Sequence, residues 1–157
     1  MEATLPEKSI TFTTESRLEN VSLVGVVIKA ICESIPLAET LSRNIELSVV
    51  EGVTNAIKHA YGLQKGNNVE IAALVFDDRI TIKISDTGKG MDPQRCENCQ
   101  EIDFEPEDSK TLPVCGMGLH IMRSIMDEMY YETTSGKNTM TLVKRFKNYN
   151  KHTGDET

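Results

Sequence analysis

Three short groups of residues in this sequence are suited to a phosphorylated ligand. They are Glu51-x-x-x-Asn55, Asp86-x-Gly88-x-Gly90 and Gly116-x-Gly118. The side-chain oxygen of Asn55 suits Mg²⁺, a hard cation that is usually shared with substrate phosphates. The carboxylate of Asp86, where a strand ends, can accept a hydrogen bond from an exocyclic amine. Glycines at the start of a helix allow a phosphate to approach the backbone N–H groups and the positive end of the helix dipole.

Each of these motifs is weak by itself, and their order in the chain makes the combination specific. The sequence contains no G-x-x-x-x-G-K-[ST] segment, which excludes a Walker loop. It also lacks a dinucleotide fingerprint, because Gly116-Met117-Gly118 follows a loop and no third glycine comes three residues later. What is specific is the combination of the three motifs, their order and the acidic segment between the last two.

The first motif lies on a predicted helix, residues 47–61, that is apolar on most of its surface. At about 100° per residue, its polar positions form one narrow stripe: Ser48, Glu51, Asn55, Lys58 and His59. Because a buried polar side chain needs a hydrogen bond or a ligand, we expect this helix to line a cleft that Glu51 and Asn55 face. The alternative is a core helix whose polar stripe meets water.

The remaining elements follow from hydrophobic periodicity and turn residues. Strands are predicted at 8–14, 69–76, 79–85, 129–134 and 139–146, and helices at 15–34, 37–61 and 116–129. A turn is expected at 135–138, and the acidic segment 93–114 has no periodicity and is predicted to be a lid over the site, or else a solvated loop. This order predicts an α+β fold, a two-layer sandwich with helices on one face of a mostly antiparallel sheet.

Length and charge limit the classes of protein to consider. The 157 residues predict a single domain over 1–147 with a polar tail at 148–157. A net charge of -7 argues against direct nucleic-acid binding. There is no apolar run long enough for a membrane helix and no signal peptide, so a cytoplasmic protein without a membrane partner is expected.

Two cysteines in the acidic segment, Cys96 and Cys99, have the spacing of half a zinc site. Cys115 and one histidine would be chemically sufficient to complete it. The other interpretation is an incidental pair in a loop, because a half-site alone is a weak motif.

The chain resembles the GHKL superfamily of ATPases and, within it, the anti-sigma-factor serine/threonine kinases. The segments that carry the resemblance are 50–61 (VEGVTNAIKHAY), 86–92 (DTGKGMD) and 116–122 (GMGLHIM). Together with the first strand, the similarity extends to about residue 147. It implies a Bergerat-like ATP-binding fold that uses ATP and Mg²⁺.

The resemblance also implies roles for individual residues. Glu51 would be the general base that takes a proton from the substrate hydroxyl, and Asn55 would hold Mg²⁺. Asp86 would accept a hydrogen bond from the adenine amino group. The other nucleotide-binding positions would be Gly88, Gly90 and Met91 at the adenine, and Gly116, Met117, Gly118 and Leu119 at the phosphates. Lys58 and His59 are candidates for phosphate contact, with a solvated helix end as the alternative.

By this resemblance the protein would be an anti-sigma factor with kinase activity. It would phosphorylate an anti-sigma-factor antagonist, sequester a sigma factor and form a homodimer. The alternative is a nucleotide-dependent switch that binds a partner without phosphorylating it. That alternative rests on the lid, where only Arg95 and Lys110 are available to hold a γ-phosphate among many acidic residues.

Overall fold

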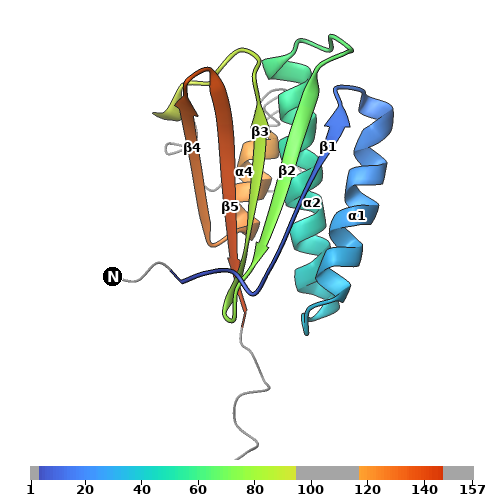
Figure 1. Ribbon diagram of the computed structural model, residues 1–157, viewed down its shortest axis with the longest axis vertical. Helices are drawn as coiled ribbons and strands as arrows, with labels where there is room; N and C mark the ends of the chain where they lie inside the picture. Colours follow the sequence, from blue (N-terminus) through green and yellow to red (C-terminus); the bar gives the residue numbers. More distant parts are fainter. Residues whose placement is uncertain (1–3, 95–116, 147–157) are drawn as a thin grey trace, which may run out of the picture.

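The computed structural model describes residues 4–94 and 117–146. In these ranges the chain forms a five-stranded sheet in the order β1-β2-β3-β5-β4, with all neighbouring strands antiparallel. The strands are β1 (Lys8–Glu15), β2 (Asn68–Val75), β3 (Arg79–Asp86), β4 (Glu128–Thr134) and β5 (Lys137–Arg145). Figure 1 views the sheet from the face that carries no helix.

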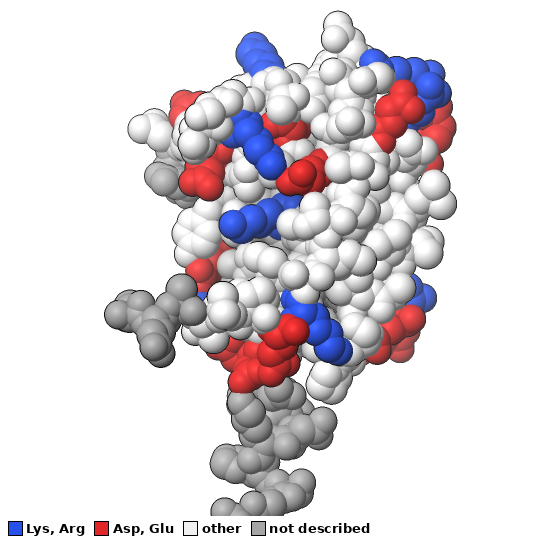
Figure 2. Space-filling model, in the orientation of Figure 1, with Lys and Arg blue, Asp and Glu red and all other residues white. Residues whose placement is uncertain are grey.

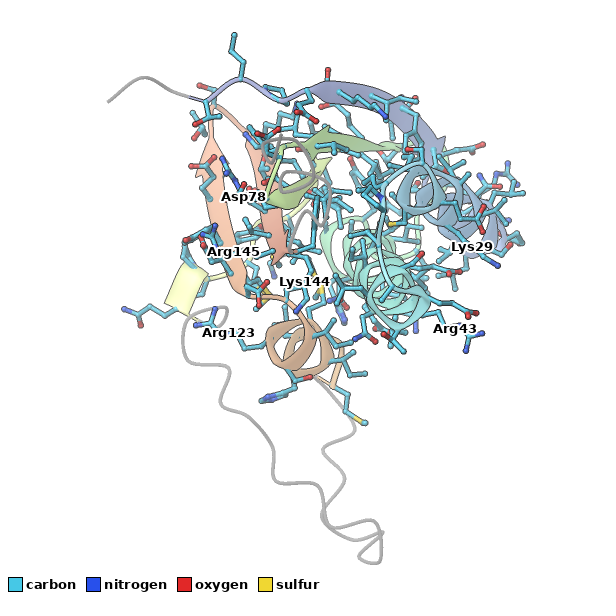
Figure 3. All side chains as sticks on the ribbon, turned by 90° about the horizontal axis from the view of Figure 1, so that it is seen from below. Lys29, Arg43, Asp78, Arg123, Lys144 and Arg145 are labelled. Atoms are coloured by element: carbon cyan, nitrogen blue, oxygen red, sulfur yellow. The ribbon has the colours of Figure 1, made fainter. Side chains whose placement is uncertain are left out.

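The helices named next, which belong to the described residues, cover the other face of the sheet, as Figures 1 and 3 show from two directions. They are the short 3₁₀ turn η1 (Leu18–Asn20), α1 (Val21–Glu33), α2 (Glu39–Asn55), the π-helical turn η2 (Ala56–Ala60) and α4 (Met117–Ile125). The predicted α+β class and two-layer arrangement are confirmed.

The core between the two layers follows from alternation in the strands. In β2, apolar residues alternate with positions that face water, and Val69 and Ile71 are fully buried. Across the sheet, Ile84 of β3 pairs with Ile71 and Ile82 pairs with Ala73, so β3 continues the same apolar face. Ile45, Val49 and Val53 of α2 are also fully inaccessible to solvent, so α2 is the central helix of the core.

The end of α4 remote from the candidate site is held by a lysine of β5. Lys144 donates hydrogen bonds from Nζ to the carbonyl of Ile125, 2.8 Å away, and to Oδ1 of Asp127 at 3.3 Å. Figure 3 shows Lys144 between the sheet and α4. A cation at a helix C-terminus pairs with unsatisfied carbonyls and with the negative end of the dipole.

Two predicted helix boundaries are wrong, because strand pairing competes with the helical pattern. The first helix was predicted from residue 15, but Glu15 is the last residue of β1, where it is paired with Asn68. The third helix was predicted to reach residue 129. It ends at Ile125 because the N–H of Asp127 donates to the carbonyl of Val143 and the chain then enters β4. The hairpin turn is also tighter than predicted, since β5 already begins at Lys137.

The predicted helix over 37–61 is two structures in succession. Its α-helical part ends at Asn55, and residues 56–60 form a wider π turn in which the N–H of Tyr61 donates to the carbonyl of Ala56. Its polar stripe also differs from the prediction, because Ser48 is fully buried while Leu47 is 43% exposed. Periodicity at about 100° per residue does not detect a π turn.

The predicted polar tail at 148–157 and the acidic segment beyond residue 94 lie outside the described residues. In the described ranges, no helix combines the length and the apolar character needed to cross a lipid bilayer.

Candidate functional site

The first and third motifs meet where α4 begins. A Cβ added at Gly118 would lie 2.7 Å from Oε2 of Glu51, and 3.4 and 3.5 Å from Nδ2 and Oδ1 of Asn55. The backbone of the first turn of α4 therefore contacts both side chains directly. Glu51 and Asn55 are each half-buried, as expected for polar groups that line a cleft rather than a closed core.

A second glycine brings these helices onto the sheet. A Cβ at Gly52 would lie only 2.4 Å from Cδ1 of Ile84 and 3.7 Å from Sδ of Met122. Because Gly52 has no side chain, α2 packs closely against β3 and α4 at this point. Ile84 precedes Asp86 by two residues and lies on the same strand face, so Asp86 follows directly beyond the α2–β3 contact.

The carboxylate of Asp86 is 8% exposed and is held by two hydrogen bonds. Nδ2 of Asn138 donates to Oδ1 at 2.7 Å, and the N–H of Gly88 donates to the same oxygen at 3.0 Å. Among the described residues, both bonds to this carboxylate end on Oδ1, so Oδ2 is the oxygen available to a ligand. An acceptor in this position suits an amino group.

Burial raises the pKa of Asp86 above its ordinary value, and the hydrogen bonds from Asn138 and Gly88 oppose this shift in part. Desolvation has the larger effect. The pocket therefore holds the ionised form of Asp86 at a cost in stability, which a ligand that donates a hydrogen bond would offset.

The loop after Asp86 is fixed against two neighbouring elements. A Cβ at Gly88 would lie 2.3 Å from the carbonyl oxygen of Ala60, so only glycine fits at the end of η2. The hydroxyl of Tyr61 accepts a hydrogen bond from the N–H of Thr87 at 2.9 Å and donates to the carbonyl of Asn68.

The other side of this loop faces the β4–β5 hairpin. A Cβ at Gly90 would lie 3.1 Å from Oδ1 of Asn138. The N–H of Met91 donates to the hydroxyl of Tyr131 at 2.9 Å. The segment that the sequence assigned to the adenine is therefore held between the end of η2 with Tyr61 on one side and the β4–β5 hairpin on the other.

Two further predicted site residues, Lys58 and His59, lie next to the residues described above on the surface of η2. Both are exposed on this π turn, which directly follows Asn55. His59 lines an open depression of about 420 Å³ together with Tyr61, Gly88 and Lys89. This depression lies beside the candidate site and includes neither Glu51 nor Asp86, so the chemistry of the side chains locates the site better than the depression does.

At α4, Met117 is 42% exposed and Leu119 is buried. Gly116, Arg95, Lys110 and the cysteines at 96, 99 and 115 lie outside the described residues. Within the described ranges, no group of three or more His, Cys, Asp or Glu side chains is arranged to hold a metal. The one described cysteine, Cys32, is buried, and burial raises its pKa to about 11.

Asn138 and Tyr131 are the residues of this region that the sequence did not single out. Asn138 follows Ser135-Gly136-Lys137, so it looks like an ordinary turn residue. Only the pairing of the strands reveals its place in the site, because Asn138 of β5 lies opposite both Asp86 and Thr133.

Comparison with known proteins decides the family. A family model described as the histidine kinase-like ATPase domain matches residues 14–144. This range includes the Glu51–Asn55 motif, the Asp86–Gly90 motif and the start of α4. The chain belongs to the histidine kinase-like ATPase family. The predicted resemblance to GHKL ATPases is confirmed, and within this ATPase family the relatives define a narrower branch.

That branch is the anti-sigma-factor serine kinases. The chain is 31% identical over 132 residues to the anti-sigma F factor of Caldanaerobacter subterraneus subsp. tengcongensis, which covers 83% of this chain and 88% of the relative. It is 26% identical over 133 residues to the serine-protein kinase RsbW of Listeria monocytogenes, with 83% of each chain covered.

A solved structure supports the fold of this histidine kinase-like ATPase. The crystal structure of the RsbU and RsbW domains of a Mycobacterium tuberculosis protein superimposes with a TM-score of 0.61 at 17% identity. The match covers 89% of this chain and 33% of the larger one.

Proposed function

We propose that this protein is an ATP- and Mg²⁺-dependent serine/threonine protein kinase that acts as a cytoplasmic anti-sigma factor. Its substrate is an anti-sigma-factor antagonist protein, and its second partner is a sigma factor that it holds inactive. The relatives named anti-sigma F factor and serine-protein kinase support this assignment. The observation that carries it is the contact of Gly118 with Glu51 and Asn55, because it joins a carboxylate, an amide and a helix N-terminus in one place.

The chemistry of these groups fits Mg²⁺-ATP. The first turn of α4 supplies backbone N–H groups for phosphate, with no Cβ at position 118 in the way. Asn55 provides a half-buried amide oxygen beside that turn, and Asp86 provides a buried acceptor for the adenine amino group. In this proposal Gly88, Gly90 and Met91 shape the adenine pocket, while Gly116, Met117 and Leu119 complete the segment near the phosphates.

In this mechanism, most of the catalysis is positioning and neutralisation of charge. Bound Mg²⁺ would neutralise phosphate oxygens, and Asn55 is the residue that would hold it. Glu51 takes the proton from the serine or threonine hydroxyl of the antagonist, which requires an approach to about 3 Å. The exposed Lys58 and His59 are within the proposal as further phosphate contacts supplied by η2.

Calorimetric titration with ATP, with and without Mg²⁺, tests the pocket. Wild-type protein should bind ATP, Asp86→Asn should lose most of the affinity for adenine nucleotides, and Asn55→Ala should lose the dependence on Mg²⁺. Absence of ATP and ADP binding by the wild type would contradict the proposed nucleotide site.

A phosphotransfer assay separates the kinase from a switch that only binds its partner. With γ-labelled ATP and the antagonist protein of the same organism, Glu51→Gln should bind ATP normally and transfer phosphate at least about a hundredfold more slowly, as is typical when a general base is removed. Unchanged transfer by Glu51→Gln would refute the base assignment. A wild type that binds ATP and partner without any transfer would instead establish the switch.

We also propose that the protein is a homodimer, through the edge formed by β1 and α1. Leu23 and Val26 of α1 are 63% and 64% exposed, and Val27 beside them is partly exposed. β1 is paired on one side only, with β2. Figure 2 shows few charged side chains over the middle of β1 and the adjoining part of α1. An apolar helix face next to an open strand edge is a surface that soluble proteins usually cover.

A further inference from the structure

One buried amide, that of Asn138, uses its hydrogen-bonding groups to hold the segment that faces the proposed adenine. Its side chain is 1% exposed. Nδ2 donates to Oδ1 of Asp86 at 2.7 Å and to the carbonyl oxygen of Gly88 at 3.0 Å. Oδ1 accepts from the hydroxyl of Thr133 at 2.8 Å. The three contacts come from β3, from the loop after it and from β4.

The orientation of this amide is determined by the chemistry of its neighbours. The carbonyl of Gly88 can only accept a hydrogen bond, so the atom that faces it must be the nitrogen. The ionised carboxylate of Asp86 is also an acceptor, so the flipped orientation would set two acceptors against each other, and the hydroxyl of Thr133 donates to the remaining oxygen. With both N–H groups committed, Asn138 cannot turn away from Asp86 without leaving buried polar groups unpaired.

Fixing Asn138 in turn fixes the carboxylate of Asp86. Oδ1 lies between Nδ2 of Asn138 and the N–H of Gly88, and these two donors restrict rotation of the carboxylate. Oδ2 then remains as a pure acceptor. Such an acceptor pairs with an exocyclic amine at position 6 of a purine and repels a carbonyl oxygen there, because two acceptors would face one another in a buried site.

We propose that Asn138 is a positioning residue that sets the preference for adenine by holding Asp86 in this orientation. The inference rests on the proposed function, because it concerns the adenine side of the same site. In this role Asn138 acts through Asp86, and the β4–β5 hairpin contributes to base selection through Asn138 and Thr133.

The test compares ATP with purine riboside triphosphate, which lacks only the 6-amino group. By calorimetry, wild type should bind ATP about ten- to a hundredfold more tightly, as expected for a hydrogen bond to a charged group. In Asn138→Ala this ratio should fall below about threefold, while the affinity for purine riboside triphosphate should change little. A merely structural role would weaken both nucleotides by one common factor and leave the ratio unchanged, and that result would overturn the proposal.

Two further variants keep the test decisive. Thr139→Val is the matched control: it removes a 3.0 Å contact between the hydroxyls of Thr139 and Ser85, one register position away on the opposite face of the same strands. It should keep the wild-type ratio. If Asn138→Ala does not fold, Thr133→Val removes one support of the amide and should lower the ratio partly; an unchanged ratio in that variant would overturn the proposal.

The wild-type titration separates this inference from the proposed function. Wild type that binds neither nucleotide would refute the proposed function, and the inference with it. Wild type that prefers ATP, together with an Asn138→Ala variant of equal preference, would refute the inference alone.

Discussion

At the scale of single residues, Asp86 illustrates a group whose burial opposes stability. Its pKa is raised by desolvation, so the folded protein retains this proton at pH values where the unfolded chain has already lost it. The folded state therefore binds more protons, and the contribution of Asp86 to stability falls as pH rises from the ordinary aspartate pKa through the raised one.

Asp86→Asn should accordingly be at least as stable as wild type near neutral pH in the absence of nucleotide. The amide oxygen of asparagine can still accept from Asn138 and Gly88, and no charge is buried. Urea unfolding at neutral pH and at about pH 3, below the ordinary aspartate pKa, measures this. The advantage of the variant should disappear at the acidic pH, and a variant clearly less stable at neutral pH would contradict the argument.

Ser48 is a second residue whose buried polar group opposes stability. It is fully buried in α2, and its Oγ has no hydrogen-bond partner among the described residues. Ser48→Ala should stabilise the protein by about 1 kcal/mol, because an unpaired polar group is removed and alanine favours the helix.

Chemical denaturation measures the change, with Ser42→Ala as the matched control on the same helix. Ser42 hydrogen-bonds to the thiol of Cys32, so losing its hydroxyl should give no gain. Equal stabilisation by both variants would show that helix propensity alone is responsible.

At the scale of elements, two glycines on facing helices are expected to matter for different properties, Gly52 for stability and Gly118 for nucleotide binding. Gly52→Ala would force a Cβ against Ile84 inside the core, and overpacking of this kind should cost about 1–3 kcal/mol. Gly118→Ala would clash only with the end of the flexible Glu51 side chain, and it would meet Asn55 at ordinary van der Waals distance, so the free protein should retain about its wild-type stability.

The expected loss in Gly118→Ala is in nucleotide binding, because the methyl group occupies the space between α4 and Asn55. Its ATP affinity should fall at least about tenfold, as when a well-placed contact is lost. Thermal unfolding and ATP titration of both variants separate the two effects. A Gly118→Ala protein with normal ATP affinity would show that phosphate does not approach this turn.

Sequence periodicity predicted the five strands and the three α-helices of the described residues, but not the 3₁₀ and π turns, and it was least accurate where two elements compete for the same backbone. Nothing in the residues from Ala56 to Ala60 distinguishes a π turn from an α turn, since the difference lies in which carbonyl each N–H selects. Asn138 escaped notice because its partners are 52 and 50 residues distant in sequence, at Asp86 and Gly88. The sequence singled out Glu51, Asn55 and Gly118 from their motifs, and the structure brings the three together, while their roles stay a prediction.

At the scale of the whole molecule, the edge formed by β1 and α1 predicts a dimer that a single charge should disrupt. Val26→Asp would place a carboxylate in the centre of the apolar face of α1, where association would have to bury it. Analytical ultracentrifugation should show a dimer for wild type and a monomer for Val26→Asp. Tyr130→Ser, which removes an exposed aromatic from β4 at the opposite edge of the sheet, is the matched control and should remain dimeric. A monomeric wild type would refute the dimer.

The strand order has a consequence for how the protein is made. β3 lies between β2, which precedes it by a short hairpin, and β5, which is the last strand of the described chain. The acceptor at Asp86 is therefore completed by a residue that the ribosome adds 52 positions later. A growing chain can form β1, β2, β3 and the first two helices and still lack the proposed adenine pocket. Nucleotide bound at the proposed site would stabilise the chain only after β5 has been made, so earlier intermediates must rely on the apolar core alone.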